Sequence, residues 1–188
     1  MNSTKPAIFL DRDGTINKLN GYITNFEQIQ ILDGVPAAIK IFNKLEFVVI
    51  VITNQPVINM GLITDQELQS IHHKIQSEIF ANGGLIHTFL YCPHEDLSKV
   101  TNRKLAIDCN CRKPKSGLID QALKLSPINI KESWLIGDSW RDVELAQNLG
   151  INHFQIINAN TEITRRSYQV ESLFEAAQKI NSINTGRE

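Results

Sequence analysis

The chain has 188 residues, 42% of them hydrophobic, which is enough for one domain with a sizeable core. Its net charge is −1, and basic and acidic residues are interspersed, which argues against a nucleic-acid or anionic-membrane partner. The longest apolar run, residues 47–52, is too short to span a bilayer, and residues 1–6 lack a secretory signal. We therefore expect a cytoplasmic protein, and a monomer because no spare apolar helix face is evident.

Short apolar runs alternate with amphipathic segments along the whole chain. Runs typical of buried strands cover residues 7–10, 47–52, 85–91, 133–137 and 153–157. Helical patterns cover residues 33–45 (with Asp33 as N-cap), 117–125 and 143–149, another runs from residue 64 to the pair Gly83-Gly84, and a last helix starts near Val170. A small hairpin or flap is expected at residues 21–24, and residues 181–188 are expected to fray.

This alternation predicts an α/β fold, a doubly wound, Rossmann-like parallel sheet. The spacing between the predicted strands leaves no room for a separate cap domain. We expect a single domain over residues 1–188.

Polar side chains follow three of the predicted strands at the point where each strand ends. Asp11 and Asp13 follow the first strand, and Thr53 and Asn54 follow the second. Asp138 follows the fourth strand. Because the carboxyl ends of parallel strands meet at one edge of the sheet, we expect these side chains to share a crevice.

Two further features belong to this edge. The basic pair Arg112-Lys113 precedes the helix at residue 117, and Asp142 lies four residues after Asp138. Carboxylates, a hydroxyl and a lysine in one crevice suit Mg²⁺ and a phosphate. A carboxylate needs no base to attack phosphorus, and Mg²⁺ with Lys113 would neutralise charge on the transferred group. Polar residues at the end of any single strand are common in turns. Polar residues at the ends of three predicted strands, together with Lys113, predict phosphoryl transfer.

All three cysteines of the chain lie in one polar loop with a histidine. They form the pairs Cys92-x-His94 and Cys109-x-Cys111. Four such ligands with no open position predict a structural zinc site that folds loop 92–111 and positions Arg112 and Lys113. The alternative is that these are buried cysteines and a surface histidine. The remaining histidines are expected at surface or strand positions rather than as ligands: His72, His73, His87 and His153.

The chain resembles the haloacid dehalogenase-like phosphohydrolases over nearly its whole length. The resemblance is carried by Asp11-Arg12-Asp13-Gly14-Thr15, by Thr53, by Lys113 and by the acidic pair Asp138 and Asp142. It implies that Asp11 is a nucleophile that forms an aspartyl-phosphate. It also implies that Asp13 protonates the leaving oxygen and then activates water, which requires Asp13 to hold a proton near neutral pH.

The same resemblance implies a ligand set. Mg²⁺ would be held by Asp11, by the backbone carbonyl of Asp13 and by Asp138. Thr53 and Lys113 would hold the phosphoryl oxygens, while Asp142 orients the site.

The cysteine loop narrows this resemblance. Cys-x-His followed by Cys-x-Cys-Arg-Lys-Pro is similar to the histidinol-phosphate and heptose-bisphosphate phosphatase branch, and it fits the heptose enzymes best. The implied reaction removes the 7-phosphate of D-glycero-D-manno-heptose 1,7-bisphosphate, a small phosphorylated sugar. Asn54 and Arg112 would contact that substrate, and the flap at Tyr22 would shape its pocket. The chain departs from the branch at Pro56-Val57, where Ser-Gly is usual, and at Met60, where an Arg is usual.

Three other functions remain open. Within the same chemistry, the substrate is histidinol phosphate or another small phosphate ester. A nucleic-acid 3′-phosphatase shares the Thr-Asn-Gln motif, but a basic binding surface is not evident. The non-enzymatic alternative is a zinc-stabilised binding module, against which the complete set of Asp, Thr and Lys residues argues.

Overall fold

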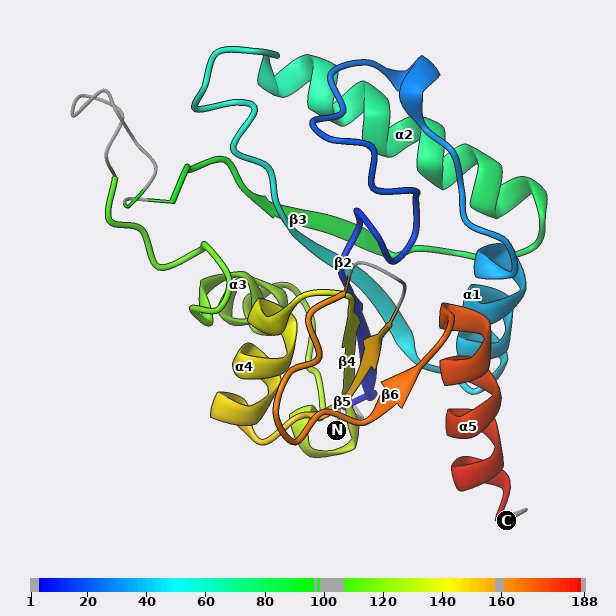
Figure 1. Cartoon of the computed structure of the whole chain (residues 1–188). Helices are drawn as coiled ribbons and strands as arrows, with labels where there is room; N and C mark the ends of the chain where they lie inside the picture. The colour runs from blue at the N-terminus through cyan, green and yellow to red at the C-terminus, as the bar shows by residue number, and fades with distance from the viewer. Residues whose placement is uncertain (1–3, 97, 99–106, 158–160, 187–188) are drawn as a thin grey trace.

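The computed structural model describes residues 4–96, 98, 107–157 and 161–186, and within them a parallel sheet of six strands forms the centre (Figure 1). Its spatial order is β3-β2-β1-β4-β5-β6. The strands are β1 (Ala7–Leu10), β2 (Val48–Asn54), β3 (Thr88–Cys92), β4 (Trp134–Gly137), β5 (Asn152–Ile156) and β6 (Gln169–Val170). The helices are η1 (Phe26–Gln28), α1 (Val35–Lys44), α2 (Asp65–Ala81), α3 (Gly117–Leu125), η3 (Ile130–Glu132), α4 (Trp140–Leu149) and α5 (Leu173–Thr185). The predicted doubly wound parallel sheet is confirmed.

Helices cover both faces of this sheet. Figure 1 shows α1 and α5 on one side and α3 and α4 on the other. β1 lies between the two layers, and its side chains alternate between two separate apolar clusters. Ile8 and Leu10 pack with α1, α2 and α5, whereas Ala7 and Phe9 pack with α3 and α4. Burial on both faces explains why β1 reads as an unbroken apolar run.

The sixth strand was missed by sequence reasoning. Val170 is spaced from Leu173 as on a helix face, but it pairs with Ile156 in β6. β6 ends at Val170, and Ser172 caps the helix that follows, because its Oγ accepts a hydrogen bond from the backbone N–H of Glu175 (3.1 Å). The predicted start of the last helix was therefore wrong by three residues.

Several predicted boundaries also differ. The N-cap of α1 is Gly34, at φ +77°, and not Asp33. α4 begins at Trp140 rather than at residue 143, because Ser139 and Asp142 form a capping box. α5 continues to Thr185, where fraying was expected, and ends at Gly186 in the left-handed region.

The flap between β1 and α1 is not a hairpin. It is closed at its base by an isolated antiparallel bridge between Asn17 and Ile31, and Asn25 caps the 3₁₀ turn η1 within it. The edge strand β3 begins at Thr88, three residues later than the pattern indicated. Among the described residues, no helix is both long and apolar enough to cross a membrane.

Candidate active site

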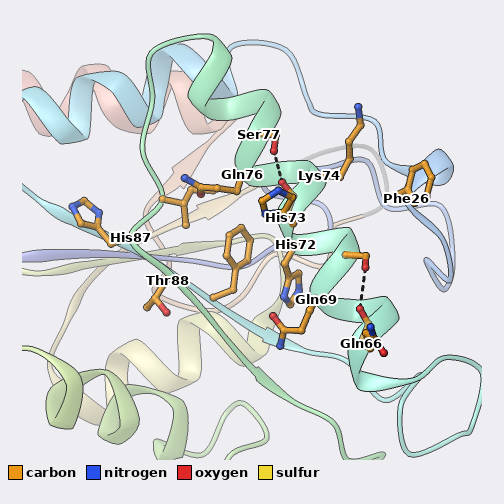
Figure 2. A pocket seen from close by; sticks show the side chains of 13 residues that line it. Phe26, Gln66, Gln69, His72, His73, Lys74, Gln76, Ser77, His87 and Thr88 are labelled. Carbon is orange, nitrogen blue, oxygen red and sulfur yellow. Dashed lines mark hydrogen bonds between the residues drawn. The ribbon is translucent and has the colours of Figure 1, made fainter.

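The polar strand ends converge on one pocket of about 560 Å³ at the carboxyl edge of the sheet. β1, β2 and β4 are neighbours in the sheet, so the residues that follow them lie side by side. Every residue predicted to take part in phosphoryl transfer or substrate contact lines this pocket: Asp11, Asp13, Tyr22, Thr53, Asn54, Arg112, Lys113 and Asp138. A larger hollow of about 860 Å³ lies between α2 and β3 (Figure 2), and none of those eight residues lines it.

Lys113 forms the electrostatic centre of the pocket. Its side chain is 2% exposed, and its Nζ lies 3.0 Å from Asp11 Oδ1 and 2.6 Å from Asp142 Oδ1. Burial raises the pKa of Asp11 to about 7, against the lowering effect of Lys113. Burial, followed by the charge of Asp142, raises the pKa of Asp138 to about 6. Three carboxylates around one ammonium leave excess negative charge that a cation would neutralise.

The three carboxylates are arranged as a candidate cation site. One oxygen each of Asp11, Asp138 and Asp142 lies within 4.8 Å of the others. Asp142 is already paired, because its Oδ1 accepts from Lys113 and its Oδ2 accepts from the Ser139 hydroxyl (2.7 Å). Asp11 and Asp138 are therefore better placed than Asp142 to offer a carboxylate oxygen to a cation.

Asp13 is held by three side chains that the sequence did not single out. Arg12 donates from Nε (3.1 Å) and Nη2 (2.8 Å) to the Asp13 carboxylate. Gln55 donates from Nε2 to Oδ2 (2.8 Å), and Asn17 donates from Nδ2 to Oδ1 (2.9 Å). All three lie inside or beside recognisable motifs, but their side-chain directions are not readable from spacing.

Asn54 links the second strand to the basic pair. Its Oδ1 accepts from the backbone N–H of Lys113 (3.0 Å), and its Nδ2 donates to the Lys113 carbonyl (3.2 Å). Both polar atoms of the amide are thus engaged with one backbone residue. These two hydrogen bonds fix the position of the Lys113 backbone, from which its side chain extends into the pocket.

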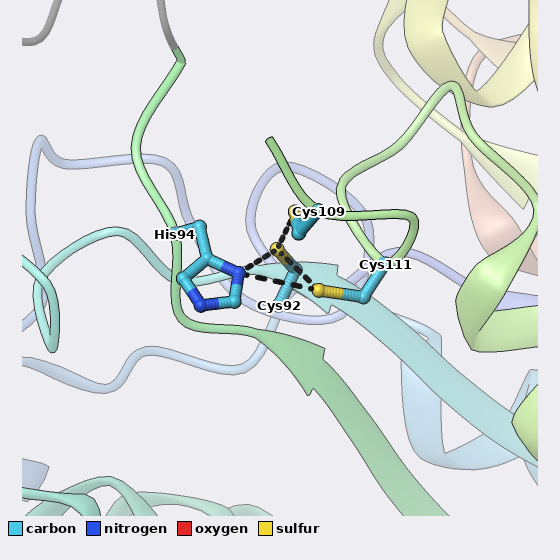
Figure 3. A group of neighbouring side chains, drawn as sticks. All are labelled: Cys92, His94, Cys109 and Cys111. Atoms are coloured by element: carbon cyan, nitrogen blue, oxygen red, sulfur yellow. Dashed lines mark hydrogen bonds between the residues drawn. The ribbon is translucent and has the colours of Figure 1, made fainter. Parts of the chain in front are cut away.

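The cysteine loop brings Cys92, His94, Cys109 and Cys111 together as a group that could hold a metal ion, and residues 97 and 99–106 within the loop lie outside the described residues. Cys92 Sγ lies 2.9 Å from Cys111 Sγ and 3.5 Å from Cys109 Sγ (Figure 3). His94 Nδ1 lies 3.7 Å from Cys92 Sγ and 3.5 Å from Cys111 Sγ. Burial and the hydrogen bond from Cys111 raise the pKa of the Cys92 thiol above its ordinary value. The donor set and its spacing fit a tetrahedral metal.

Two arginines stand at the rim of the pocket. Arg112 donates from Nη1 to the carbonyl of His94 (2.7 Å), which ties it to the Cys/His cluster. Arg141 lines the same pocket from the first turn of α4, with its guanidinium 4.8 Å from the centre of the Trp140 ring. Sequence reasoning missed Arg141, whose only signal was its position between Asp138 and Asp142.

For one of the remaining histidines the predicted position was wrong. His72 was expected at the surface or in a strand, but it lies on α2 and is 3% exposed. His73 and His87 are exposed, and His153 lies in β5.

Comparisons with known proteins show which family this chain belongs to. A family model described as HAD-hydrolase-like matches residues 110–176. D-glycero-β-D-manno-heptose-1,7-bisphosphate 7-phosphatase of Rhodopseudomonas palustris is 31% identical over 167 residues, which cover 89% of this chain and 92% of the relative. The Escherichia coli K12 protein of the same name is 29% identical and covers 87% of this chain, and the match spans 85% of that relative.

The fold also matches a solved structure. D,D-heptose 1,7-bisphosphate phosphatase from B. bronchiseptica, complexed with magnesium and phosphate, has a TM-score of 0.81 at 23% identity, over 93% of this chain and 97% of that chain. The two chains share one fold over nearly their whole lengths. This chain therefore belongs to the haloacid dehalogenase-like phosphatases, in the family of the heptose-bisphosphate phosphatases.

Proposed function

We propose that the chain is a Mg²⁺-dependent phosphatase that removes the 7-phosphate of D-glycero-D-manno-heptose 1,7-bisphosphate, acting as a cytoplasmic monomer. One observation carries the proposal: Asp11 faces Lys113 at 3.0 Å, beside Asp138, in a pocket of about 560 Å³. That volume suits a small sugar phosphate.

Asp11 is the proposed nucleophile. One of its carboxylate oxygens attacks phosphorus, the bond from phosphorus to the sugar oxygen breaks, and an aspartyl-phosphate forms on Asp11. Lys113, whose ammonium already contacts Asp11, would then lie beside the transferred oxygens and offset their charge. Asp142 keeps Lys113 in place from its other side.

Asp13 is the proposed acid and base. It gives a proton to the leaving sugar oxygen, and it later takes a proton from the water that attacks the aspartyl-phosphate and releases inorganic phosphate. Arg12, Gln55 and Asn17 fix the direction of its carboxylate.

Thr53 and Asn54, at the end of β2, have different proposed roles. The Thr53 hydroxyl accepts a hydrogen bond from Gln55 Nε2 (2.9 Å), so its own proton is free to donate to a phosphoryl oxygen. Asn54, predicted as a substrate contact, has both amide atoms on the Lys113 backbone. We assign it the task of holding Lys113 within the pocket.

The carboxylate cluster is the proposed Mg²⁺ site. Asp11, Asp138 and the backbone carbonyl of Asp13 would hold the ion, because hard oxygen ligands with excess negative charge are what Mg²⁺ prefers. When bound, the ion would offset charge on the transferred phosphoryl group.

Gly14 provides a test of that site. It has φ +80°, and a Cβ there would overlap the Asp138 carboxylate. We expect Gly14→Ala to raise the Mg²⁺ concentration needed for half-maximal activity by roughly tenfold or more, because Asp138 must move. Gly21→Ala is a matched control, since Gly21 has φ +73° but nothing within 4 Å of a Cβ. Equal Mg²⁺ dependence of the two variants would contradict the proposed site.

The second phosphate of the bisphosphate requires its own cations. Met60 supplies none, but Arg112 and Arg141 both line the pocket. Because a charged hydrogen bond is worth about 1.5–3 kcal/mol, we expect Arg141→Ala to raise KM for the bisphosphate roughly tenfold. Its kinetics on p-nitrophenyl phosphate should stay unchanged. Arg165→Ala, at an exposed position outside this pocket, is the control. An unchanged KM for the bisphosphate would remove Arg141 from the subsite.

The Cys/His cluster is the proposed zinc site. Zn–S bonds of ~2.3 Å in a tetrahedron place sulfurs about 3.8 Å apart. The Cys92–Cys109 separation of 3.5 Å is close to that value, and the Cys92–Cys111 separation of 2.9 Å would have to widen when the metal binds. Three cysteines and one histidine leave no open position, so the role is structural. Through the His94 carbonyl this site would fix Arg112 and, next to it, Lys113.

Steady-state kinetics test the proposed function directly. The purified protein is assayed with the α and β anomers of the heptose bisphosphate, with histidinol phosphate and with p-nitrophenyl phosphate, each with and without Mg²⁺. We expect the highest kcat/KM for a heptose bisphosphate and no turnover without Mg²⁺. Highest kcat/KM for histidinol phosphate would establish the alternative substrate, and no hydrolysis of any ester would leave a zinc-stabilised binding module.

A further inference from the structure

Arg12 is a buried cation whose guanidinium contacts three side chains. It is among the largest fully buried side chains, with 0% exposure. Its Nε and Nη2 both reach Asp13, and Nη2 also donates to Gln55 Oε1 (2.9 Å). Its Nη1 faces Nε2 of His72 at 3.4 Å. A planar guanidinium that contacts three side chains has a fixed orientation. Its hydrogen bonds in turn fix the orientation of the Asp13 carboxylate.

His72 contacts Nη1 of Arg12, and His72 itself does not line the pocket. It projects from α2 toward β3 (Figure 2), and its ring stacks on Phe89 with centroids 4.7 Å apart and planes 15° apart. Burial, followed by the charge of Arg12, lowers the pKa of His72 to about 3, so the ring is neutral. A guanidinium can only donate, so Nε2 must accept and Nδ1 must carry the proton.

The histidine is a costly choice for a purely structural position. Its Nδ1 is buried and has no hydrogen-bond partner among the described residues. An unpaired buried donor destabilises a fold, whereas a phenylalanine would stack on Phe89 without that cost. What a phenylalanine lacks is an acceptor for Arg12.

We propose that His72 is a positioning residue for Asp13: its Nε2 holds Arg12, and the Arg12 fork sets the Asp13 carboxylate for proton transfer. This inference rests on the proposed function, in which Asp13 is the acid and base. His72 lies outside the substrate pocket, so it acts on the reaction only through Arg12. Its loss should therefore alter proton transfer and leave substrate binding unchanged.

The leaving group gives a readout specific to that role. A sugar oxygen is a poor leaving group and needs the proton from Asp13, whereas p-nitrophenolate leaves without one. kcat/KM reports the steps up to cleavage of the ester, so the two esters separate acid catalysis from general damage. The experiment measures kcat, KM and kcat/KM for the heptose bisphosphate and for p-nitrophenyl phosphate with saturating Mg²⁺.

Two substitutions of His72 are compared with a neighbour. His72→Phe keeps the stacked ring and removes the acceptor, whereas His72→Gln keeps an acceptor oxygen. His73→Phe, on the same helix but exposed, is the control. We expect His72→Phe to lose roughly tenfold in kcat/KM on the bisphosphate, part of the ~10²–10⁴-fold that acid–base catalysis supplies. The loss should lie in kcat, should be much smaller on p-nitrophenyl phosphate and should be largely restored in His72→Gln.

A second variant, at Arg12, tests the same inference if His72→Phe does not fold. Arg12→Lys keeps the charge but lacks the fork, so it should show the same dependence on the leaving group. The double variant Arg12→Lys/His72→Phe should be no worse than Arg12→Lys alone, because His72 acts through Arg12. Equal losses on both esters, unchanged kinetics of His72→Phe, or additive losses in the double variant would overturn the inference and leave the proposed function intact. A wild-type protein that hydrolyses neither ester would overturn both.

Discussion

Asp11→Asn is expected to abolish turnover while leaving the fold intact. An amide has no anionic oxygen to attack phosphorus, so kcat should fall by at least about 10⁴-fold, as for other enzymes that lose their nucleophile. The contacts of Lys113 with Asp142 and of Asp142 with Ser139 remain available in this variant. The measurement is kcat for the heptose bisphosphate with saturating Mg²⁺.

Stability separates this loss from misfolding. Burial raises the pKa of Asp11 to about 7 in the metal-free protein, so the ionised carboxylate is less favourable in the folded than in the unfolded chain. This penalty is present above the unfolded pKa, and a neutral amide does not carry it. We therefore expect metal-free Asp11→Asn to unfold at pH 8 at the same temperature as the wild type or higher. Asp33→Asn, an exposed acid outside the pocket, is the control and should keep full activity. Residual hydrolysis by a well-folded Asp11→Asn protein would contradict the nucleophile assignment.

Removal of zinc is expected to cost both stability and activity. Metal analysis should find one zinc per chain in the wild type. Binding of a structural zinc contributes directly to folding, and a loss of about 3 kcal/mol lowers the unfolding midpoint of a chain of this size by roughly 6–12 °C. Activity should fall as well, because Arg112 is anchored on the carbonyl of His94 and Lys113 follows it in the chain.

A matched pair of histidine variants makes this test specific. His94→Gln removes one ligand of the cluster, whereas His73→Gln changes an exposed histidine outside it. We expect the first to lose zinc and to show the lower midpoint, and the second to behave as wild type. Chelation followed by zinc and Mg²⁺ should restore activity, whereas Mg²⁺ alone should not. A zinc-free protein with unchanged midpoint and kinetics would disprove the site.

The positions of the reactive groups could be predicted from the sequence because they depend on local pattern. Asp11 and Asp138 each follow an apolar strand, and a parallel sheet brings such ends to one edge whatever the details of packing. The Cys/His ligands are two close pairs, so closing one loop gathers them. The same local patterns gave α3 its observed bounds, Gly117–Leu125.

Other features depend on which segments meet across the sheet, and only the tertiary structure decides them. Val170 follows helical spacing, yet pairing with Ile156 makes it a strand residue. Asn54 lines the pocket as the sequence predicts, but its two hydrogen bonds to the backbone of Lys113, 59 residues away, are visible only in the folded chain.

Arg12 shows the division most clearly. The sequence places a carboxylate residue on each side of Arg12, Asp11 and Asp13. A charged side chain between two other charged residues is ordinarily expected to be exposed to solvent. The register of β1 with β2 and the packing of α2 bury it instead, with Gln55 and His72 as partners 43 and 60 residues away. The physical reason is that periodicity records which face of an element is apolar, whereas a buried ion finds its partners only when separate elements have docked.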